Sequence, residues 1–134
     1  MTKILDIEGV GPVFAGKLGK VGIKTVEALL KEGCTPKGRE TIAKESGIDK
    51  GLILEWVNHA DLYRIKGVGE EYSDLLEEAG VDTVVELATR KPENLHKKIL
   101  EVNEAKKLVR RPPSMKEVVK WVDQAKKLPR VVEY

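Results

Sequence analysis

The chain has 134 residues, of which 41% are hydrophobic, 34% charged and only 4% aromatic. A chain of this length can bury one modest core or two small halves, which excludes a large multidomain enzyme. The single cysteine, Cys34, excludes an internal disulfide and a cysteine-rich metal site. Helix formers are abundant and alternating strand patterns are scarce, so we predict an all-α fold.

Charge is unevenly distributed, although the formal net charge is only +2. Residues 1–62 hold equal numbers of acidic and basic residues, residues 63–89 hold 2 basic and 7 acidic residues, and residues 90–134 hold 13 basic and 6 acidic residues. A basic cluster beside a Pro-Pro pair consists of Lys106, Lys107, Arg110 and Arg111. The sequence leaves two interpretations of this cluster equally open, a solvated linker or a phosphate contact.

The first predicted α-helix follows a glycine turn. The stretch "IEGVGPVFAGKL" places Gly9 and Gly11 on either side of Val10, and Pro12 opens a helical pattern that Gly22 ends as a left-handed cap. Two helices that meet in a tight hairpin need one residue with positive φ and another without a side chain, and the two glycines supply both. A tight interhelical turn already accounts for this pattern.

The next two predicted helices have recognisable starts. Thr35 followed by Pro36 is typical of a helix N-terminus, and Asp49 is positioned to cap the helix that carries Trp56. Arg39 lies close to the first of these starts. Its guanidinium can reach a phosphate or pair with a glutamate of the same helix, and the sequence favours neither interpretation.

The glycine turn occurs a second time 58 residues later, in "IKGVGEEYSDLL". Further along, the offset grows to 65, where "WVNHADL" from Trp56 matches "WVDQAKKL" from Trp121. We therefore predict two pseudo-symmetric repeats of short helices, residues 1–62 and 63–134, packed into a single compact domain over residues 1–134. Both tryptophans have apolar neighbours at helical spacing, so we expect them in the core.

The second repeat carries its own helix start and stop signals. Gly80 is expected to end the helix after the second glycine turn. Thr83 with Glu86, and Ser114 with Glu117, have the spacing of a capping box. We therefore expect a helix to begin at each of these two positions.

The glycine turns are also the candidate functional sites. Free backbone N–H groups at the start of a helix, backed by the positive end of the helix dipole, form a site for a phosphate oxygen. We expect the amides of Val10, Gly11 and Val13 to make this contact, with Lys17 and Lys20 nearby. The candidate nucleic-acid-binding residues of both turns are Gly9, Val10, Gly11, Val13, Lys17, Lys20, Lys66, Gly67, Val68 and Gly69.

The second turn is the weaker candidate because of its charges. Lys66 is favourable for phosphate binding, but Glu70 and Glu71 stand in the first turn of the following helix. Their carboxylates interact well with the helix dipole and occupy the field that a phosphate would use. We therefore expect this turn to assist the first one only weakly.

Both turn segments resemble helix-hairpin-helix elements, which bind the sugar-phosphate backbone in many DNA repair and replication proteins. The likeness covers nearly the whole chain, since "TPKGRETIAKESGI", "NLHKKILEVNEAKKLVRR" and "LPRVVEY" resemble the tandem helix-hairpin-helix family catalogued as domain of unknown function 4332. The resemblance implies a pseudo-symmetric all-α module with weak, non-specific binding to DNA. The alternative is a protein-interaction scaffold that has lost nucleic-acid binding and has a protein as its partner.

Neither catalysis nor a cofactor is expected. In helix-hairpin-helix glycosylases a Gly-Pro-Asp element follows the hairpin, but none follows either hairpin of this sequence. No Walker loop or nucleophile elbow is present either. His59 and His96 lack ligand partners at metal spacing, so we predict surface or helix-end roles and no metal site. No run approaches the ~20 apolar residues of a membrane span, and the first residues lack a signal peptide's apolar region, so we expect a cytoplasmic protein without membrane contact.

Overall fold

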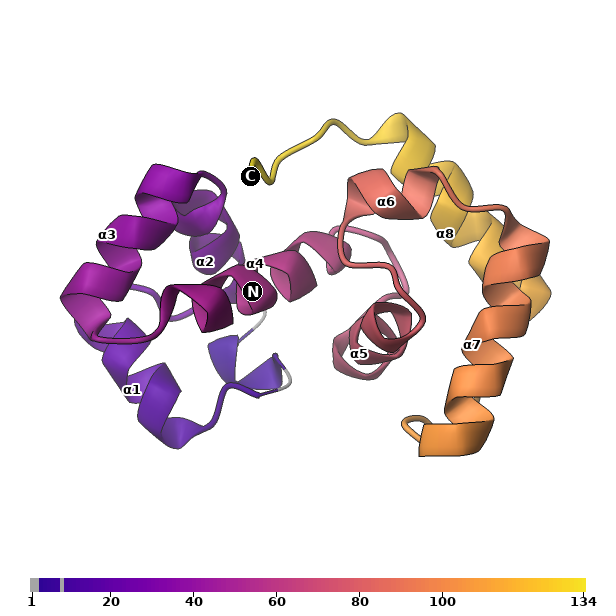
Figure 1. Cartoon of the computed structure of the whole chain (residues 1–134), viewed down its shortest axis with the longest axis horizontal. Coiled ribbons are helices and arrows are strands. Elements are labelled where there is room, and N and C mark those ends of the chain that lie inside the picture. Colours follow the sequence, from indigo (N-terminus) through magenta and orange to yellow (C-terminus); the bar gives the residue numbers. More distant parts are fainter. Residues whose placement is uncertain (1–2, 8) are drawn as a thin grey trace. The chain divides into compact units, whose positions relative to one another are not determined.

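The computed structural model describes residues 3–7 and 9–134, and this part of the chain is built from helices (Figure 1). Its only β-type pairing is an isolated antiparallel bridge between Lys3 and Thr25. The prediction of an all-α fold is therefore confirmed. None of the described helices has the length and apolar composition that crossing a membrane requires. In chain order the elements are η1 (Ile4–Asp6), α1 (Pro12–Lys20), α2 (Val26–Gly33), α3 (Pro36–Ser46), α4 (Lys50–Leu62), α5 (Glu70–Glu78), α6 (Val84–Ala88), α7 (Pro92–Lys106) and α8 (Met115–Lys127).

The helices group into two compact units. Unit 1 comprises Met1–Asp61 together with Val131–Tyr134, and unit 2 comprises Leu62–Arg130. The junction after Asp61 lies one residue from the predicted boundary between the repeats. The last four residues of the sequence belong to unit 1, although the prediction places them in the second repeat. The single domain over residues 1–134 stays a prediction.

Side-chain caps explain where several helices begin. The hydroxyl oxygens of Thr25 and Thr35 each accept a backbone N–H from the residue three positions later, at 3.0 Å in both cases. Asp49 accepts the N–H of Gly51 at 3.0 Å, as its predicted capping role requires. Each of these bonds satisfies an N–H group that the first helical turn leaves without an intrahelical acceptor. The predicted starts at Thr35 and Asp49 are therefore confirmed.

The two predicted capping boxes have different outcomes. At α8 the box is complete, because Ser114 accepts the N–H of Glu117 and the Glu117 carboxylate accepts the N–H of Ser114. At α6, Thr83 accepts the N–H of Glu86 at 3.3 Å, but the Glu86 carboxylate accepts the N–H of Asp82 instead. The capping-box prediction is thus confirmed at α8 and half wrong at α6.

The predicted stops after the first helix of each repeat are confirmed. Gly22 and Gly80 have φ values of +86° and +94°, the left-handed conformation that glycine adopts without steric cost. In each case the next residue, Ile23 or Val81, turns its N–H back to a leucine carbonyl of the preceding helix, at 2.9 and 2.8 Å. The chain therefore leaves both helices in the same way.

Aliphatic side chains build the interior of each unit. In unit 1, Leu18, Leu29, Ile53 and Val57 are fully buried. In unit 2, one hydrophobic cluster runs from Leu62 to Ala125 and draws on α5, α6, α7 and α8. Trp56 and Trp121 are 1% and 3% exposed, so the prediction that both tryptophans belong to the core is confirmed.

Candidate nucleic-acid interface

The first glycine turn joins η1 to α1 through a left-handed residue. Gly9 has a φ of +91° and is exposed, whereas the side chain of Val10 is buried. The N–H of Val10 donates to the carbonyl of Ile7 at 3.1 Å, and the N–H of Ala15 donates to the carbonyl of Gly11 at 2.9 Å. The first of these bonds closes the turn and the second begins α1.

Trp56 of α4 supports this turn from the interior. A Cβ atom added to Gly9 would stand 3.4 Å from the indole nitrogen of Trp56. The ring of Phe14, in the first turn of α1, packs on the same indole with centroids 5.1 Å apart and an interplanar angle of 57°. Such a tilted aromatic pair fixes the start of α1 against α4. The conformation of the turn is therefore set by buried contacts.

The start of α1 presents uncapped backbone to solvent. Gly11 is the N-cap residue in an extended conformation, it forms no side-chain cap, and a Cβ atom added there would meet nothing within 4 Å. Pro12 has no N–H, so the first-turn donors without an intrahelical acceptor are those of Val13 and Phe14. The side chain of Val13 is 70% exposed. These two amides, together with that of Gly11, form an open group of donors.

The predicted role of Val10 differs from its observed contacts. Its N–H already donates to the carbonyl of Ile7, and its side chain is buried in the core. The amide of Phe14, which was not among the predicted contacts, is at the third position of the helix. It replaces the amide of Val10 as the third open donor. The signal that could have identified it is Pro12, because a proline at the first position moves the first available helical N–H groups one residue onward.

Two lysines add positive charge to α1. The Nζ atom of Lys17 lies 5.9 Å from the centroid of the Phe14 ring, within the range of a cation–π contact. This contact directs the ammonium of Lys17 toward the first turn of its own helix. Lys17 and Lys20 are both exposed, and both belong to the last turn of α1.

The second glycine turn has the same internal contacts at an offset of 58 residues. Gly67 has a φ of +96°, and Val68 is buried with its N–H donating to Ile65 at 3.1 Å. A Cβ atom added to Gly67 would stand 3.3 Å from the indole nitrogen of Trp121. Tyr72 packs on that indole with centroids 5.2 Å apart and an interplanar angle of 53°.

The second glycine turn differs from the first in the polar side chains around it. The side chain of Gln124 accepts the N–H of Lys66 at 3.0 Å and donates to its carbonyl at 3.3 Å, so α8 holds the backbone at this point. Gly69 is the uncapped N-cap residue of α5, like Gly11 in α1, but Glu70 and Glu71 follow it and both are exposed. The structure therefore brings two carboxylates to the start of α5 and none of the described residues brings one to the first turn of α1.

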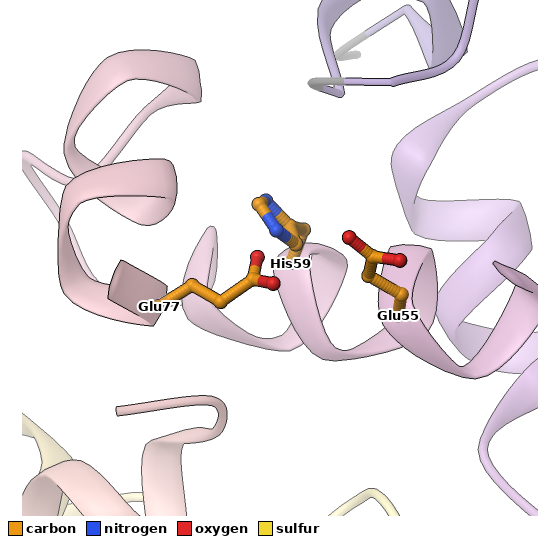
Figure 2. Close-up of side chains that lie close together, drawn as sticks. All are labelled: Glu55, His59 and Glu77. Carbon is orange, nitrogen blue, oxygen red and sulfur yellow. The ribbon is translucent and has the colours of Figure 1, made fainter. Parts of the chain in front are cut away.

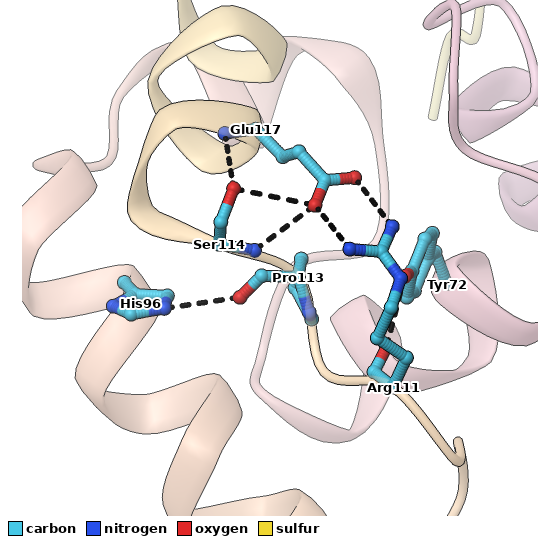
Figure 3. A network of polar contacts seen from close by, with 6 residues as sticks. All are labelled: Tyr72, His96, Arg111, Pro113, Ser114 and Glu117. Carbon is cyan, nitrogen blue, oxygen red and sulfur yellow. Dashed lines mark hydrogen bonds and ion pairs between the residues drawn. The ribbon is translucent and has the colours of Figure 1, made fainter.

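Half of the predicted basic cluster is engaged in ion pairs. Arg111 donates from its two terminal guanidinium nitrogens to the Glu117 carboxylate, at 3.2 and 3.3 Å (Figure 3). Lys106 pairs with Glu78 at the end of α5. The Tyr72 hydroxyl donates to the carbonyl of Arg111 at 2.9 Å, which ties the segment after α7 to α5. These contacts favour a structural linker over a phosphate contact for Lys106 and Arg111.

The same network lowers the pKa of Glu117 below its ordinary value. The first cause is the hydrogen bond from the backbone N–H of Ser114, and the ion pair with Arg111 adds to it. The partner Arg111 has its pKa raised by the hydrogen bond that it donates to Glu117 and by the charge of that carboxylate. Both shifts favour the charged pair in the folded protein.

We expect Glu117→Gln to make stability less dependent on pH in the acidic range. A carboxylate whose pKa is lowered on folding stabilises the protein above its unfolded pKa, near 4.5, and this contribution is lost as the pH falls through the folded value. The variant should therefore melt at a lower temperature than the wild type at pH 7. The two melting temperatures should converge below pH 3. Thermal melts followed by circular dichroism between pH 2.5 and 7 measure this, and a constant difference over that range would contradict the assignment.

Arg39 has a role that neither sequence interpretation gave it. It is 3% exposed and donates to the carbonyls of Gly33 at 2.9 Å and Glu133 at 2.7 Å. Its guanidinium therefore binds two backbone carbonyls of unit 1, and both the phosphate contact and the pairing with a glutamate are wrong.

The two histidines differ in their surroundings. His59 lies in the last turn of α4 and is 2% exposed, so the expected helix-end position is right and the expected surface position is wrong. Figure 2 shows His59 one helical turn after Glu55 on α4, while Glu77 belongs to α5 of unit 2. A ring nitrogen of His96 lies 3.0 Å from the carbonyl of Pro113 (Figure 3). The absence of a metal site stays a prediction.

Comparison with known proteins gives one match. No curated protein and no solved structure matches the chain. The model of one protein family matches residues 8–128, which include both glycine turns and every one of the described helices α1 to α8 in full. The chain therefore belongs to the family described as Domain of unknown function (DUF4332).

Proposed function

We propose that the chain is a non-catalytic module of two pseudo-symmetric helix-hairpin-helix repeats that binds the phosphate backbone of DNA without reading its sequence. The observation that carries this proposal is the uncapped, exposed first turn of α1. There the amides of Gly11, Val13 and Phe14 have no intrahelical acceptor, and no described residue beyond the chain neighbours of Gly11 comes within 4 Å of the position of its Cβ atom.

The chemistry of this turn suits a phosphate oxygen. Backbone N–H groups at a helix N-terminus and the positive end of the helix dipole both favour an anion. Lys17 and Lys20 add positive charge on the same helix, and no acidic residue is present in its first turn. A contact made by backbone amides and lysines recognises phosphate and carries no information about the bases.

The matched contacts of the two glycine turns support the repeat. Left-handed Gly9 and Gly67, the bonds from Val10 and Val68, and the two aromatic pairs all recur at equivalent positions. Each turn would offer a phosphate contact of its own. Glu70 and Glu71 would make the second contact the weaker one, because like charges repel phosphate.

Fluorescence anisotropy of a labelled 20-base-pair duplex tests the proposal. We expect binding at low salt that is equal for two unrelated DNA sequences and falls steeply as salt increases, because phosphate contacts release counterions. At physiological salt the dissociation constant should lie on the order of 10⁻⁴ to 10⁻⁶ M, as for other non-specific contacts. Absence of binding to DNA at low salt would refute the proposal in favour of the protein-interaction scaffold, and a pull-down from cell extract would then identify the partner.

We expect the double substitution Glu70→Gln, Glu71→Gln to raise DNA affinity at low salt severalfold. Removing two negative charges lifts the repulsion of phosphate at the start of α5. The same change should lower the melting temperature slightly, since each carboxylate at an exposed helix N-terminus stabilises by roughly 0.3–1 kcal/mol. Anisotropy at two salt concentrations and a thermal melt measure the two effects.

A matched control separates local charge from net charge. Glu101→Gln, Glu104→Gln removes the same two charges from exposed positions of α7. If this control raises affinity as much as the change at α5, the effect comes from the overall charge, and the second turn is not a phosphate contact.

A further inference from the structure

Residues 131–134 form an extended segment that packs on unit 1. The segment follows α8 and the non-helical residues 128–130, which belong to unit 2. The side chain of Val132 is 3% exposed. The backbone of Glu133 is held on both sides, since its N–H donates to the carbonyl of Cys34 at 2.7 Å and its carbonyl accepts from Arg39 at 2.7 Å. Tyr134 donates its hydroxyl to the side chain of Asn58 at 3.0 Å.

Unit 1 supplies a built receptor for this segment. The guanidinium of Arg39 is buried, and one of its two recorded bonds goes to the carbonyl of Glu133. A buried charged donor that loses its acceptor is costly, so the receptor favours a peptide carbonyl at this position. Recognition therefore combines backbone hydrogen bonds at residue 133 with burial of an aliphatic side chain at residue 132.

The receptor is open to solvent along one side. A hollow of about 400 Å³ is lined by Pro36, Arg39, Lys50, Gly51, Leu54 and Tyr134. The side chain of Tyr134 is 61% exposed, and residues 133 and 134 are both on the surface. Departure of the segment would uncover Val132 and Arg39, so its place in unit 1 must be taken by an equivalent segment.

We propose that unit 1 also receives residues 131–134 of a second copy, so that two chains associate by exchanging this segment. The segment enters unit 1 from unit 2, and each of its recorded bonds to Cys34, Arg39 and Asn58 would be the same whichever copy supplied it. Exchange of an identical element in this way is a low-cost route to a dimer. Within one chain the short connection gives the segment an effective concentration of about millimolar, so exchange becomes prominent only at comparable protein concentrations.

Disulfide trapping between two full-length variants tests this proposal. The receptor chain is the wild type, which carries Cys34. The donor chain carries Cys34→Ser, Glu133→Cys and a size tag. A backbone hydrogen bond between residues 133 and 34 brings their Cα atoms to roughly 5–6 Å, within the range of roughly 4.4–6.8 Å that a disulfide spans. We expect a mixed disulfide on a non-reducing gel, increasing as the protein concentration approaches about 1 mM.

Two control donors make the result specific. Addition of Val132→Asp to the donor should reduce the mixed disulfide at least tenfold, because the charged side chain cannot enter the buried position of Val132. A donor with Cys34→Ser and Glu101→Cys, exposed on α7, should give no more than this background. Absence of the mixed disulfide at about 1 mM, or equal yields from all three donors, would overturn the proposal. The assay uses no nucleic acid, so its outcome is independent of DNA binding.

Discussion

A Gly11→Asp variant is expected to lose DNA binding while keeping full thermal stability. Gly11 is the N-cap residue of α1 with extended backbone dihedrals of −86° and −178°, which an aspartate adopts without strain. The new carboxylate can accept the N–H groups of Val13 or Phe14 and would occupy the position proposed for a phosphate oxygen. The affinity at low salt should fall at least tenfold, because the amides are engaged and the added charge repels the duplex.

The stability of the same variant makes the result interpretable. Aspartate is a slightly better N-cap than glycine, by a few tenths of a kcal/mol, and its charge interacts favourably with the helix dipole. Gly11→Ala is the matched control, since it leaves the amides open and adds no charge. If Gly11→Ala and Gly11→Asp bind DNA equally well, the start of α1 is not the phosphate site. Gly69→Asp, at the start of α5, should have the smaller effect on binding.

A Gly9→Ala variant is expected to lose about 1–3 kcal/mol of folding free energy. Gly9 has a φ of +91°, where a residue with a Cβ atom is strained by about this amount. The added methyl would also stand 3.4 Å from the indole nitrogen of Trp56, so the turn has no room to relax toward the core. Chemical denaturation followed by tryptophan fluorescence measures the loss.

The neighbouring glycine provides the comparison for this experiment. Gly11→Ala, only two residues further along, should cost less than Gly9→Ala, because its backbone is extended and its surroundings are open, so only the poorer N-cap propensity of alanine counts against it. Gly67→Ala should behave like Gly9→Ala, since Gly67 has a φ of +96° and faces Trp121. If Gly9→Ala and Gly11→Ala lower the free energy of unfolding equally, the positive φ of Gly9 is not the reason that the turn needs a glycine there.

Local sequence patterns were sufficient to predict the helices and several of their ends. Thr35, Asp49 and Ser114 cap helices because the bond that each side chain forms reaches only two or three residues along the chain. Gly22 and Gly80 end helices because positive φ is a property of a single residue. The burial of Trp56 and Trp121 followed from helical periodicity, which is also a local property.

Predictions that involved a choice between several partners were less successful. At Thr83 the capping box was half wrong, because the Glu86 carboxylate had a second acceptable donor in Asp82. The basic cluster could not be interpreted from its composition, since the partners of Lys106 and Arg111 are carboxylates on other helices. Similarly, Pro12 was recognised as a helix start, but which amides remained open depended on the bond from Val10 to Ile7.

The amino-acid sequence therefore determined the all-α class, the glycine turns and several helix boundaries, because each depends on the conformational preferences of a few consecutive residues. Only the tertiary structure decided what Arg39 binds, since its acceptor at Glu133 is 94 residues away in the chain. The same holds for residues 131–134, which were predicted to belong to the second repeat but are part of unit 1. A long-range contact of this kind depends on shape and on buried hydrogen-bond partners, neither of which has a periodicity that a sequence can display.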